Sequence, residues 1–423
     1  MYQVSPNNKF KIKQLGFKML FFSLLLLVYK PIISSFFISL HARTTNNQNY
    51  MKQRLLSLDV LRGITIAGMI LVNTPGSWKY VWTPLEHSEW NGLTPTDLVF
   101  PSFMFMMGMA MFISLRKFEF KLSTPLLKKI IRRTLVIFLI GTCINVFANC
   151  MYGLSYGEGN FWQTISEALG KTRTLGVLQR LALCYGIGSF IVVTVKHKRI
   201  PIIVLFLLLG YFILQVLGNG FVYGPENILS VVDRTIIGPQ HMYNDNSIEP
   251  EGILSTIPSI AHVLIGFCFG KLCMETKDMN LRLNKIFVWG SLILFAGLLL
   301  QYGCPINKKV WSPTFVLATC GIAALLLAIL LWFIDSKGKK SGTRLWAVFG
   351  VNPLFCYVLS NFLTIITDTL PMGNHNIHSI VYGFLSNSFG DNCFSSCLYA
   401  ILMVAATWLI GDILYRKKIY IKI

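Results

Sequence analysis

Residues 73–108 read N-T-P-G-S-W-K-Y-V-W-T-P-L-E-H-S-E-W-N-G-L-T-P-T-D-L-V-F-P-S-F-M-F-M-M-G, a short polar loop that runs into an apolar segment. Another apolar segment, 56–73, leads into the loop. Each segment has close to the ~20 residues that an α-helix needs to cross a bilayer. This part of the chain therefore predicts two membrane helices, joined by a loop that carries Trp, Glu and His side chains at the membrane boundary.

The rest of the chain has the composition of a membrane protein. Of its 423 residues, 54% are hydrophobic and 13% are charged, whereas soluble proteins carry roughly 25% charged residues. Lipid requires backbone hydrogen bonds to be closed internally, and the apolar segments lack the alternation of barrel strands. We therefore predict an all-α polytopic membrane protein with ten core helices, near 56–73, 97–115, 130–150, 174–195, 200–217, 253–273, 285–303, 313–334, 345–367 and 395–415.

Positive charge is distributed unevenly between the loops that alternate along the chain. The formal net charge is +20, and 24 Lys and Arg residues fall in one set of loops and the core ends, against six in the other set. Such an excess marks the cytoplasmic side of a membrane protein. We predict that the core begins and ends in the cytoplasm and that the 74–96 loop lies on the opposite face. The charge is then a topology signal, and we expect no nucleic-acid partner.

The first fifty residues fit this scheme poorly. The apolar run 19–40 is interrupted by Lys30 and Pro31, and a span here would place the four preceding lysines on the outer face. Met51 opens M-K-Q-R-L-L-S-L-D, which is typical of a natural beginning. We divide the chain into an extension, 1–50, and a ten-helix domain, 51–423. The extension is either dispensable or an added membrane-anchoring segment.

The cysteines and glycines exclude several classes of chemistry. Ten cysteines are scattered along the chain without the C-x-x-C or Cys/His spacing of a metal site. No P-loop and no dinucleotide-binding glycine pattern is present. We expect no metal, and ATP-driven transport and dinucleotide chemistry lose support.

Three polar side chains near the loop are candidates for catalysis. His87 lies within it, and histidine is the side chain that most readily takes and returns a proton near neutral pH. Asp97 follows Thr94, so it either completes a capping box at the start of the next helix or belongs to the site. Asn73 either caps the end of the preceding helix or orients an imidazole or a carbonyl group.

Four further residues are candidates for binding. Arg62 follows Asp59 by three positions, so it either pairs with that carboxylate or meets a phosphate that enters from the cytoplasm. Trp90 either belongs to the aromatic belt of the membrane interface or stacks on a sugar, and Asn91 beside it is a second acceptor-binding candidate. Arg180 lies about one and a half turns inside the fourth helix, where a charge needs a partner or an anionic ligand. It either helps to hold the core or is a third candidate for binding the acceptor.

His262 lies near the middle of the sixth predicted helix and has no partner close in sequence. We interpret it as a core histidine that is hydrogen-bonded to a neighbouring backbone group, rather than as a catalytic residue.

Six motifs together give the chain a resemblance to the heparan-α-glucosaminide N-acetyltransferase family, in its bacterial branch. They occur in order over about residues 54–415, so the extension lies outside the resemblance. The motifs are D-V-L-R-G-I (59–64), the block from His87 to Gly108, R-T-L-G-V-L-Q-R-L-A-L-C-Y (173–185), E-P-E-G-I-L-S-T-I-P-S-I (249–260), P-I-N-K-K-V-W-S-P-T-F-V-L (305–317) and G-V-N-P-L-F-C-Y-V (350–358).

The resemblance implies an enzyme of the bacterial inner membrane that acetylates an amino sugar or glycan on the far side of the membrane. It implies cytoplasmic acetyl-CoA as the co-substrate and a homodimer as the assembly. The family's active-site histidine falls on His87, and its accompanying asparagine falls on Asn73. The spacer between the two is slightly longer here and rich in Trp and Pro.

Two chemical routes and two rival functions stay open. His87 acts either as the base that deprotonates an amine or as a nucleophile that is itself acetylated. The first rival is an O-acyltransferase of envelope polysaccharide that uses the same donor. The second is a sugar transporter without chemistry.

Overall fold

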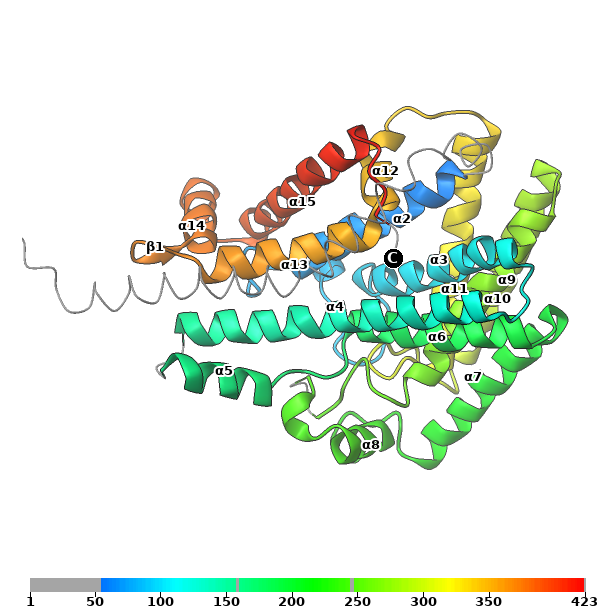
Figure 1. Cartoon of the computed structure of the whole chain (residues 1–423), viewed down its shortest axis with the longest axis horizontal. Coiled ribbons are helices and arrows are strands. Elements are labelled where there is room, and N and C mark those ends of the chain that lie inside the picture. Colours follow the sequence, from blue (N-terminus) through cyan, green and yellow to red (C-terminus); the bar gives the residue numbers. More distant parts are fainter. Residues whose placement is uncertain (1–54, 157–159, 244–246, 422–423) are drawn as a thin grey trace, which may run out of the picture.

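The computed structural model describes residues 55–156, 160–243 and 247–421. Within them the chain is a bundle of α-helices with one ladder of two short strands, so the predicted all-α class is confirmed (Figure 1). The predicted extension, 1–50, lies outside the described residues. The elements are α2 (Leu56–Asn73), α3 (Val99–Leu115), α4 (Thr124–Tyr156), α5 (Phe161–Gly170), α6 (Val177–Thr194), α7 (Ile200–Leu217), α8 (Ile228–Ile236), α9 (Thr256–Glu275), α10 (Met279–Leu300), α11 (Pro313–Leu330), α12 (Thr343–Val351), α13 (Pro353–Thr369), β1 (Pro371–Met372), β2 (His375–Asn376), α14 (Ile377–Phe389) and α15 (Cys393–Arg416).

Most of the predicted membrane spans are present. Nine helical spans in the described part of the chain are long and apolar enough to cross a membrane, and a tenth results if α12 and α13 are counted as one span. Their bounds agree with the predicted ones to within a few residues, except that α4 extends beyond the predicted 130–150 at both ends and α10 begins at Met279 rather than at 285. The chain is therefore an integral, multi-pass membrane protein.

The predicted helix near 345–367 is not continuous. The span is broken at Asn352, and α12 and α13 meet at an angle of 86°. The physical reason is Pro353, which has no N–H to donate and disfavours helical geometry in the residue before it. The amide of the buried Asn352 completes the break, since its nitrogen donates to the Ile419 carbonyl (2.9 Å) and its oxygen accepts from the Ile421 N–H (2.8 Å).

Glycines allow two pairs of helices to pack with their backbones in close approach. In the pair formed by α2 and α12, a Cβ on Gly63 would lie 1.8 Å from the Trp346 carbonyl oxygen, and a Cβ on Gly350 would lie 1.8 Å from the backbone carbonyl oxygen of Asp59. The pair formed by α3 and α9 meets in the same way at Gly108. Close backbone contact of this kind is typical of membrane bundles, where small residues replace a hydrophobic driving force.

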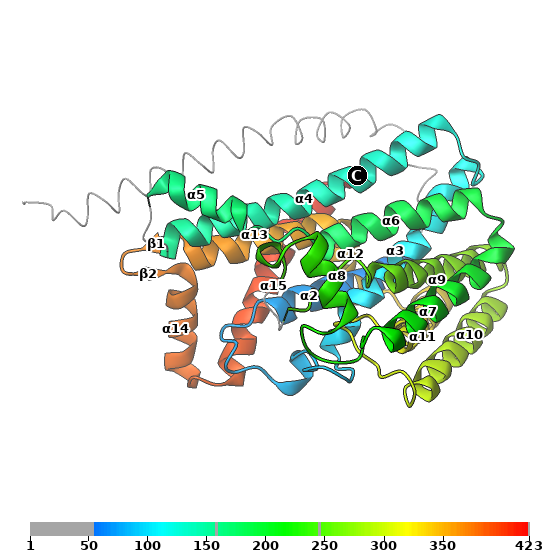
Figure 2. The same cartoon turned by 90° about the horizontal axis from the view of Figure 1, so that it is seen from below.

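The edges of the bundle carry the apolar side chains that face lipid. In two views at right angles, α10 and α14 lie at opposite ends of the molecule (Figures 1 and 2). Large apolar side chains of α10, such as Phe295 and Leu299, are exposed. An exposed apolar helix of membrane length belongs in hydrocarbon, so α10 is a lipid-facing helix.

The close approach of α2 and α12 predicts that Gly63→Ala destabilises the protein. The added methyl group would overlap a backbone carbonyl that cannot rotate away, and overpacking of this kind costs about 1–3 kcal/mol or more. The melting temperature of the purified protein in detergent measures the effect. The matched control is Gly210→Ala in the middle of α7, where a Cβ meets no atom within 4 Å. Equal melting temperatures for the two variants would contradict the prediction.

Candidate active site

Two loops at one end of the bundle are bonded to each other. The His87 loop (86–94) connects α2 to α3, and the Lys308 loop (305–312) connects α10 to α11. The Gly92 N–H donates to the Ile306 carbonyl (2.8 Å), and the Asn307 side chain donates to the Asn91 side-chain oxygen (3.1 Å). Gly92 has a φ of +128°, a conformation that side chains rarely adopt. The two loops therefore form one surface.

The Asp97 carboxylate organises the His87 loop. It is fully buried, and its Oδ1 lies 2.7 Å from His87 Nδ1. Its Oδ2 accepts the Ser88 N–H (3.1 Å) together with the Thr94 N–H (3.2 Å) and hydroxyl (3.0 Å). The Asp97 N–H in turn donates to the Thr94 hydroxyl (3.4 Å), which is the reciprocal bonding of a capping box. The same carboxylate therefore caps the helix and contacts His87, so the two roles that we predicted for Asp97 are compatible.

Lys308 is a site residue that we did not predict. Its Nζ lies 2.9 Å from His87 Nδ1, 3.2 Å from His87 Nε2 and 3.4 Å from Asp97 Oδ1. Burial lowers the pKa of the Lys308 ammonium, and the attraction of Asp97 and Glu251 offsets this only in part. Local spacing could not predict this contact, because Lys308 and His87 lie 221 positions apart in the chain. The only sequence signal for Lys308 was that it belongs to the family-like motif at 305–317.

The tautomer of His87 follows from its two neighbours. Nδ1 donates to the Asp97 carboxylate, which accepts only, so the lone pair of the neutral ring lies on Nε2. The side chain is 47% exposed, so a ligand can reach the ring from outside the bundle. A fixed imidazole with an accessible basic nitrogen can accept a proton or act as a nucleophile.

The other candidates near His87 are placed differently. Asn73 is exposed at the end of α2 and makes no hydrogen bond with His87, although both residues are described. Trp90 is half-buried, donates its indole N–H to the Phe221 carbonyl (3.0 Å) and packs on Tyr223 with the ring centres 4.8 Å apart. Trp90 and Asn91 therefore line the surface beside His87, whereas Asn73 is not held against the imidazole.

At the opposite end of α2, Arg62 forms an ion pair with Asp59, which is one of the two roles that we predicted for it. Its Nη1 lies 3.6 Å from Asp59 Oδ1 and donates to the Gly350 carbonyl (3.1 Å), next to the break between α12 and α13. This pairing accounts for the charge locally.

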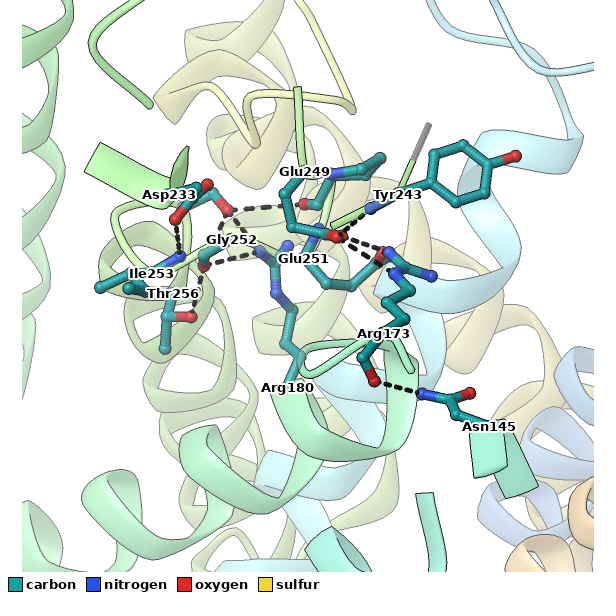
Figure 3. Close-up of polar contacts among 12 residues, drawn as sticks. Asn145, Arg173, Arg180, Asp233, Tyr243, Glu249, Glu251, Gly252, Ile253 and Thr256 are labelled. Carbon is teal, nitrogen blue, oxygen red and sulfur yellow. Dashed lines mark hydrogen bonds and ion pairs between the residues drawn. The ribbon is translucent and has the colours of Figure 1, made fainter. Parts of the chain in front are cut away.

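Charged side chains from the segments that precede α6 and α9 form a network (Figure 3). Arg173 donates to both Glu249 oxygens, at 3.1 Å from Nε to Oε2, and to Glu251 at 2.5 Å. Glu249 is fully buried and also accepts the Tyr243 N–H (2.7 Å). Sequence reasoning did not find this network because its partners lie 76 and 78 positions apart.

One nitrogen of the Arg180 guanidinium has hydrogen-bond partners. The side chain is fully buried, and its Nη2 donates to the Gly252 carbonyl (3.3 Å) and to the Ser255 hydroxyl (Figure 3). Burial opposes the ionisation of Glu251, but the attraction of Arg173, Arg180 and Lys308 outweighs it and lowers the pKa of that carboxyl group. Glu251 thus connects the charge network with the Lys308 loop.

Asp233 is a buried carboxyl group at the edge of this network. Its Oδ1 accepts the Ile253 N–H (2.9 Å), while a Cβ on Gly252 would lie 1.9 Å from its Oδ2. Burial raises the pKa of Asp233 to about 6.

Comparison with known proteins gives a consistent family. The family model described as heparan-alpha-glucosaminide N-acetyltransferase, catalytic, matches residues 54–302, more than half of the chain. The human heparan-alpha-glucosaminide N-acetyltransferase is 29% identical over 437 residues, which cover 88% of this chain and 60% of the human protein. The mouse protein of the same name is 28% identical over 435 residues, with the same coverage. The chain thus spans about 60% of the length of the curated relatives it matches.

The charge network predicts that Glu249→Gln destabilises the protein strongly. Removal of one partner of a buried ion pair leaves the other charge poorly compensated and costs about 3 kcal/mol. The matched control is Glu119→Gln, which breaks the exposed pair with Lys121 and should change stability by less than about 1 kcal/mol. Thermal unfolding of both variants measures the difference, and the prediction fails if the two midpoints coincide.

Asp233 predicts a pH dependence of stability. Because its pKa is raised on folding to about 6 from an ordinary value near 3.8, the folded state holds the proton more tightly. Its contribution to stability is therefore present below about pH 4 and is lost as the pH rises through 6, by about 2–3 kcal/mol in all. Asp233→Asn should remove this contribution, so the gap between the unfolding midpoints at pH 5 and pH 7.5 should narrow in the variant. An unchanged gap would show that other groups cause the dependence.

Proposed function

Since this chain belongs to the heparan-α-glucosaminide N-acetyltransferase family, we propose that it transfers the acetyl group of cytoplasmic acetyl-CoA to an amino sugar on the extracytoplasmic side of the membrane. Family membership and the apolar helices together describe a membrane-embedded acetyltransferase. The donor, the direction of transfer and the acceptor are our additions. The distribution of Lys and Arg supports the direction, because it assigns the His87 loop to the outer face.

One observation carries the proposal: an accessible imidazole held by a buried carboxylate at the end of a membrane bundle. The 2.7 Å contact between His87 Nδ1 and Asp97 Oδ1 orients the ring and places the lone pair of the neutral imidazole on Nε2, which Lys308 Nζ approaches to 3.2 Å. Asp97 also stabilises the imidazolium ion that forms when Nε2 takes a proton.

In the first route His87 is a general base. The nitrogen of the amino sugar attacks the thioester carbonyl carbon and forms the C–N bond, while Nε2 takes the proton that the amine must lose. The C–S bond then breaks with its electron pair on sulfur, and the imidazolium ion returns the proton to the thiolate. Atoms and charges balance without a further reactant.

In the second route Nε2 itself attacks the carbonyl carbon, and the C–S bond breaks with its electron pair on the CoA sulfur. The amine then attacks the acetyl group on the ring and forms the C–N bond, the N–C bond to Nε2 breaks, and the imidazole takes the amine's proton and passes it to the thiolate. Both routes need the lone pair of Nε2, so the geometry supports either. Acid quenching after mixing with labelled acetyl-CoA, without acceptor, distinguishes them, because only the second route leaves label on the protein.

The remaining site residues receive roles that follow from their positions. Lys308 places a positive charge beside Nε2, where it favours negative charge on the carbonyl oxygen of the thioester. We assign Trp90 and Asn91 to the acceptor sugar, because they line the surface beside His87. Asn73 stays a candidate for orienting the reacting groups at that surface, and Arg62 stays a candidate for the phosphates of CoA at the opposite end of α2.

The function predicts that His87→Ala and Asp97→Asn lose acetyl transfer. We expect a loss of at least about 100-fold for each, because general base catalysis contributes roughly 10²–10⁴-fold. The assay uses proteoliposomes with acetyl-CoA on the side of the chain termini and glucosamine on the other side, and it measures CoA release and acetylated sugar. The matched control is His375→Ala, in the exposed β1–β2 hairpin, which should keep wild-type activity.

Three outcomes would contradict the proposal. Wild-type transfer by His87→Ala would remove the mechanism. Acetylation of a fully N-acetylated sugar, with no reaction of glucosamine, would indicate an O-acyltransferase. Sugar uptake without CoA release would indicate a transporter.

A further inference from the structure

A second polar group lies inside the bundle next to the His87 site. It consists of Arg180 from α6, Trp311 from the Lys308 loop and His262 from α9, and all three side chains are buried. The Arg180 guanidinium lies 5.1 Å from the centre of the Trp311 ring, and the His262 ring centre lies 5.9 Å from it. The three side chains therefore meet around the indole.

These side chains hold polar atoms without partners. In the described part of the chain, Arg180 Nε and Nη1, Trp311 Nε1 and both ring nitrogens of His262 are buried and make no hydrogen bond. The Pro101 backbone lies beside the His262 ring, where a backbone partner was predicted, but neither ring nitrogen reaches hydrogen-bond geometry. Buried polar atoms in proteins are almost always bonded, so five unbonded ones in one place indicate a polar occupant.

The group lies on the interior side of the catalytic residues. The backbone N–H of Trp311 donates to the Lys308 carbonyl (3.0 Å), and the Phe100 ring packs edge-on against the Trp311 indole with the ring centres 5.5 Å apart. Phe100 is less than one helical turn beyond Asp97. His87 opens to the outside, whereas Arg180 and Trp311 lie behind it, away from the surface that an acceptor sugar can reach.

The charge balance indicates what kind of occupant fits. The network already pairs three cations with three anions, so Arg180 needs no anionic ligand for neutrality: Arg173, Arg180 and Lys308 stand against Asp97, Glu249 and Glu251. An ionised Asp233 would make the balance negative. The unbonded atoms of Arg180 and Trp311 are all N–H donors. A neutral ligand with a hydrogen-bond acceptor fits this arrangement better than a carboxylate or a phosphate.

We propose that Arg180 and Trp311 bind the carbonyl oxygen of the donor's acetyl thioester, with His262 as the neighbouring wall of this subsite. The proposal rests on the function proposed above and reassigns Arg180 from the acceptor to the donor. A thioester carbonyl is neutral and accepts hydrogen bonds, as the charge balance requires. Its oxygen gains negative charge when the amine attacks, and a buried cation then stabilises the reacting state more than the resting one.

Trp311→Phe tests the proposal, because it removes the indole N–H and keeps an aromatic ring. We expect kcat/KM for acetyl-CoA to fall about 10-fold or more, since loss of one such donor typically costs roughly 10²–10³-fold in kcat. Inhibition by S-ethyl-CoA, a thioether that lacks the carbonyl, and the KM for glucosamine should change less than about twofold, a small fraction of that expected loss. Arg180→Lys provides a second variant, which keeps the charge and loses the unbonded Nε and Nη1.

The matched control is Trp408→Phe. The Trp408 N–H is already bonded to the Leu345 carbonyl (3.0 Å) and belongs to α15, so its loss should leave the kinetics for acetyl-CoA unchanged. Melting temperatures of all variants show which of them fold.

Several results would overturn the proposal. A selective rise in the KM for glucosamine would assign the group to the acceptor, and equal loss of acetyl-CoA and S-ethyl-CoA binding would remove the carbonyl contact. Unchanged kinetics in both folded variants would leave only water as the occupant. If the wild-type protein releases no CoA, the proposed function itself fails. The subsite is then decided by whether Trp311→Phe loses the wild-type preference for binding acetyl-CoA over S-ethyl-CoA.

Discussion

The buried carboxylate of Asp97 is the interaction on which the site depends. It accepts hydrogen bonds from His87, Ser88 and Thr94, and Lys308 approaches it from the second loop. A buried charge is costly unless it is paired and hydrogen-bonded, so these donors are held around it. One carboxylate thereby sets the start of α3, the tautomer of the imidazole and the approach of the two loops.

The helices behind the site explain how such charges are tolerated in a membrane protein. Close glycine contacts, as at Gly63 and Gly108, draw the backbones together and leave no room for solvent. The charges of Arg173, Glu249 and Glu251 lie at the same end of the bundle and are paired with one another. The polar groups are thus collected in one region, while the outward faces of helices such as α10 are apolar.

The sequence was sufficient for the fold class and for most of the spans, because hydropathy and span length follow directly from residue type. The break at Asn352 was missed although Pro353 signals it, because the spans were placed by hydropathy and the flanking residues are as apolar as those of a continuous span. The capping pattern and the family resemblance led to Asp97 and His87. Lys308 and the pairing of Arg173 with Glu249 depend on contacts between distant segments, which local spacing does not encode. The expected partnership of Asn73 with His87 is not seen as a hydrogen bond.

The join between α12 and α13 has a consequence for how the protein is made. Both polar groups of the Asn352 amide are bonded by backbone that the ribosome adds 67 and 69 residues later. Until Ile419 and Ile421 have been synthesised, this amide must bond to water or to other groups. The helices around it can enter the bilayer in order, but this corner of the bundle can reach its final form only late in translation.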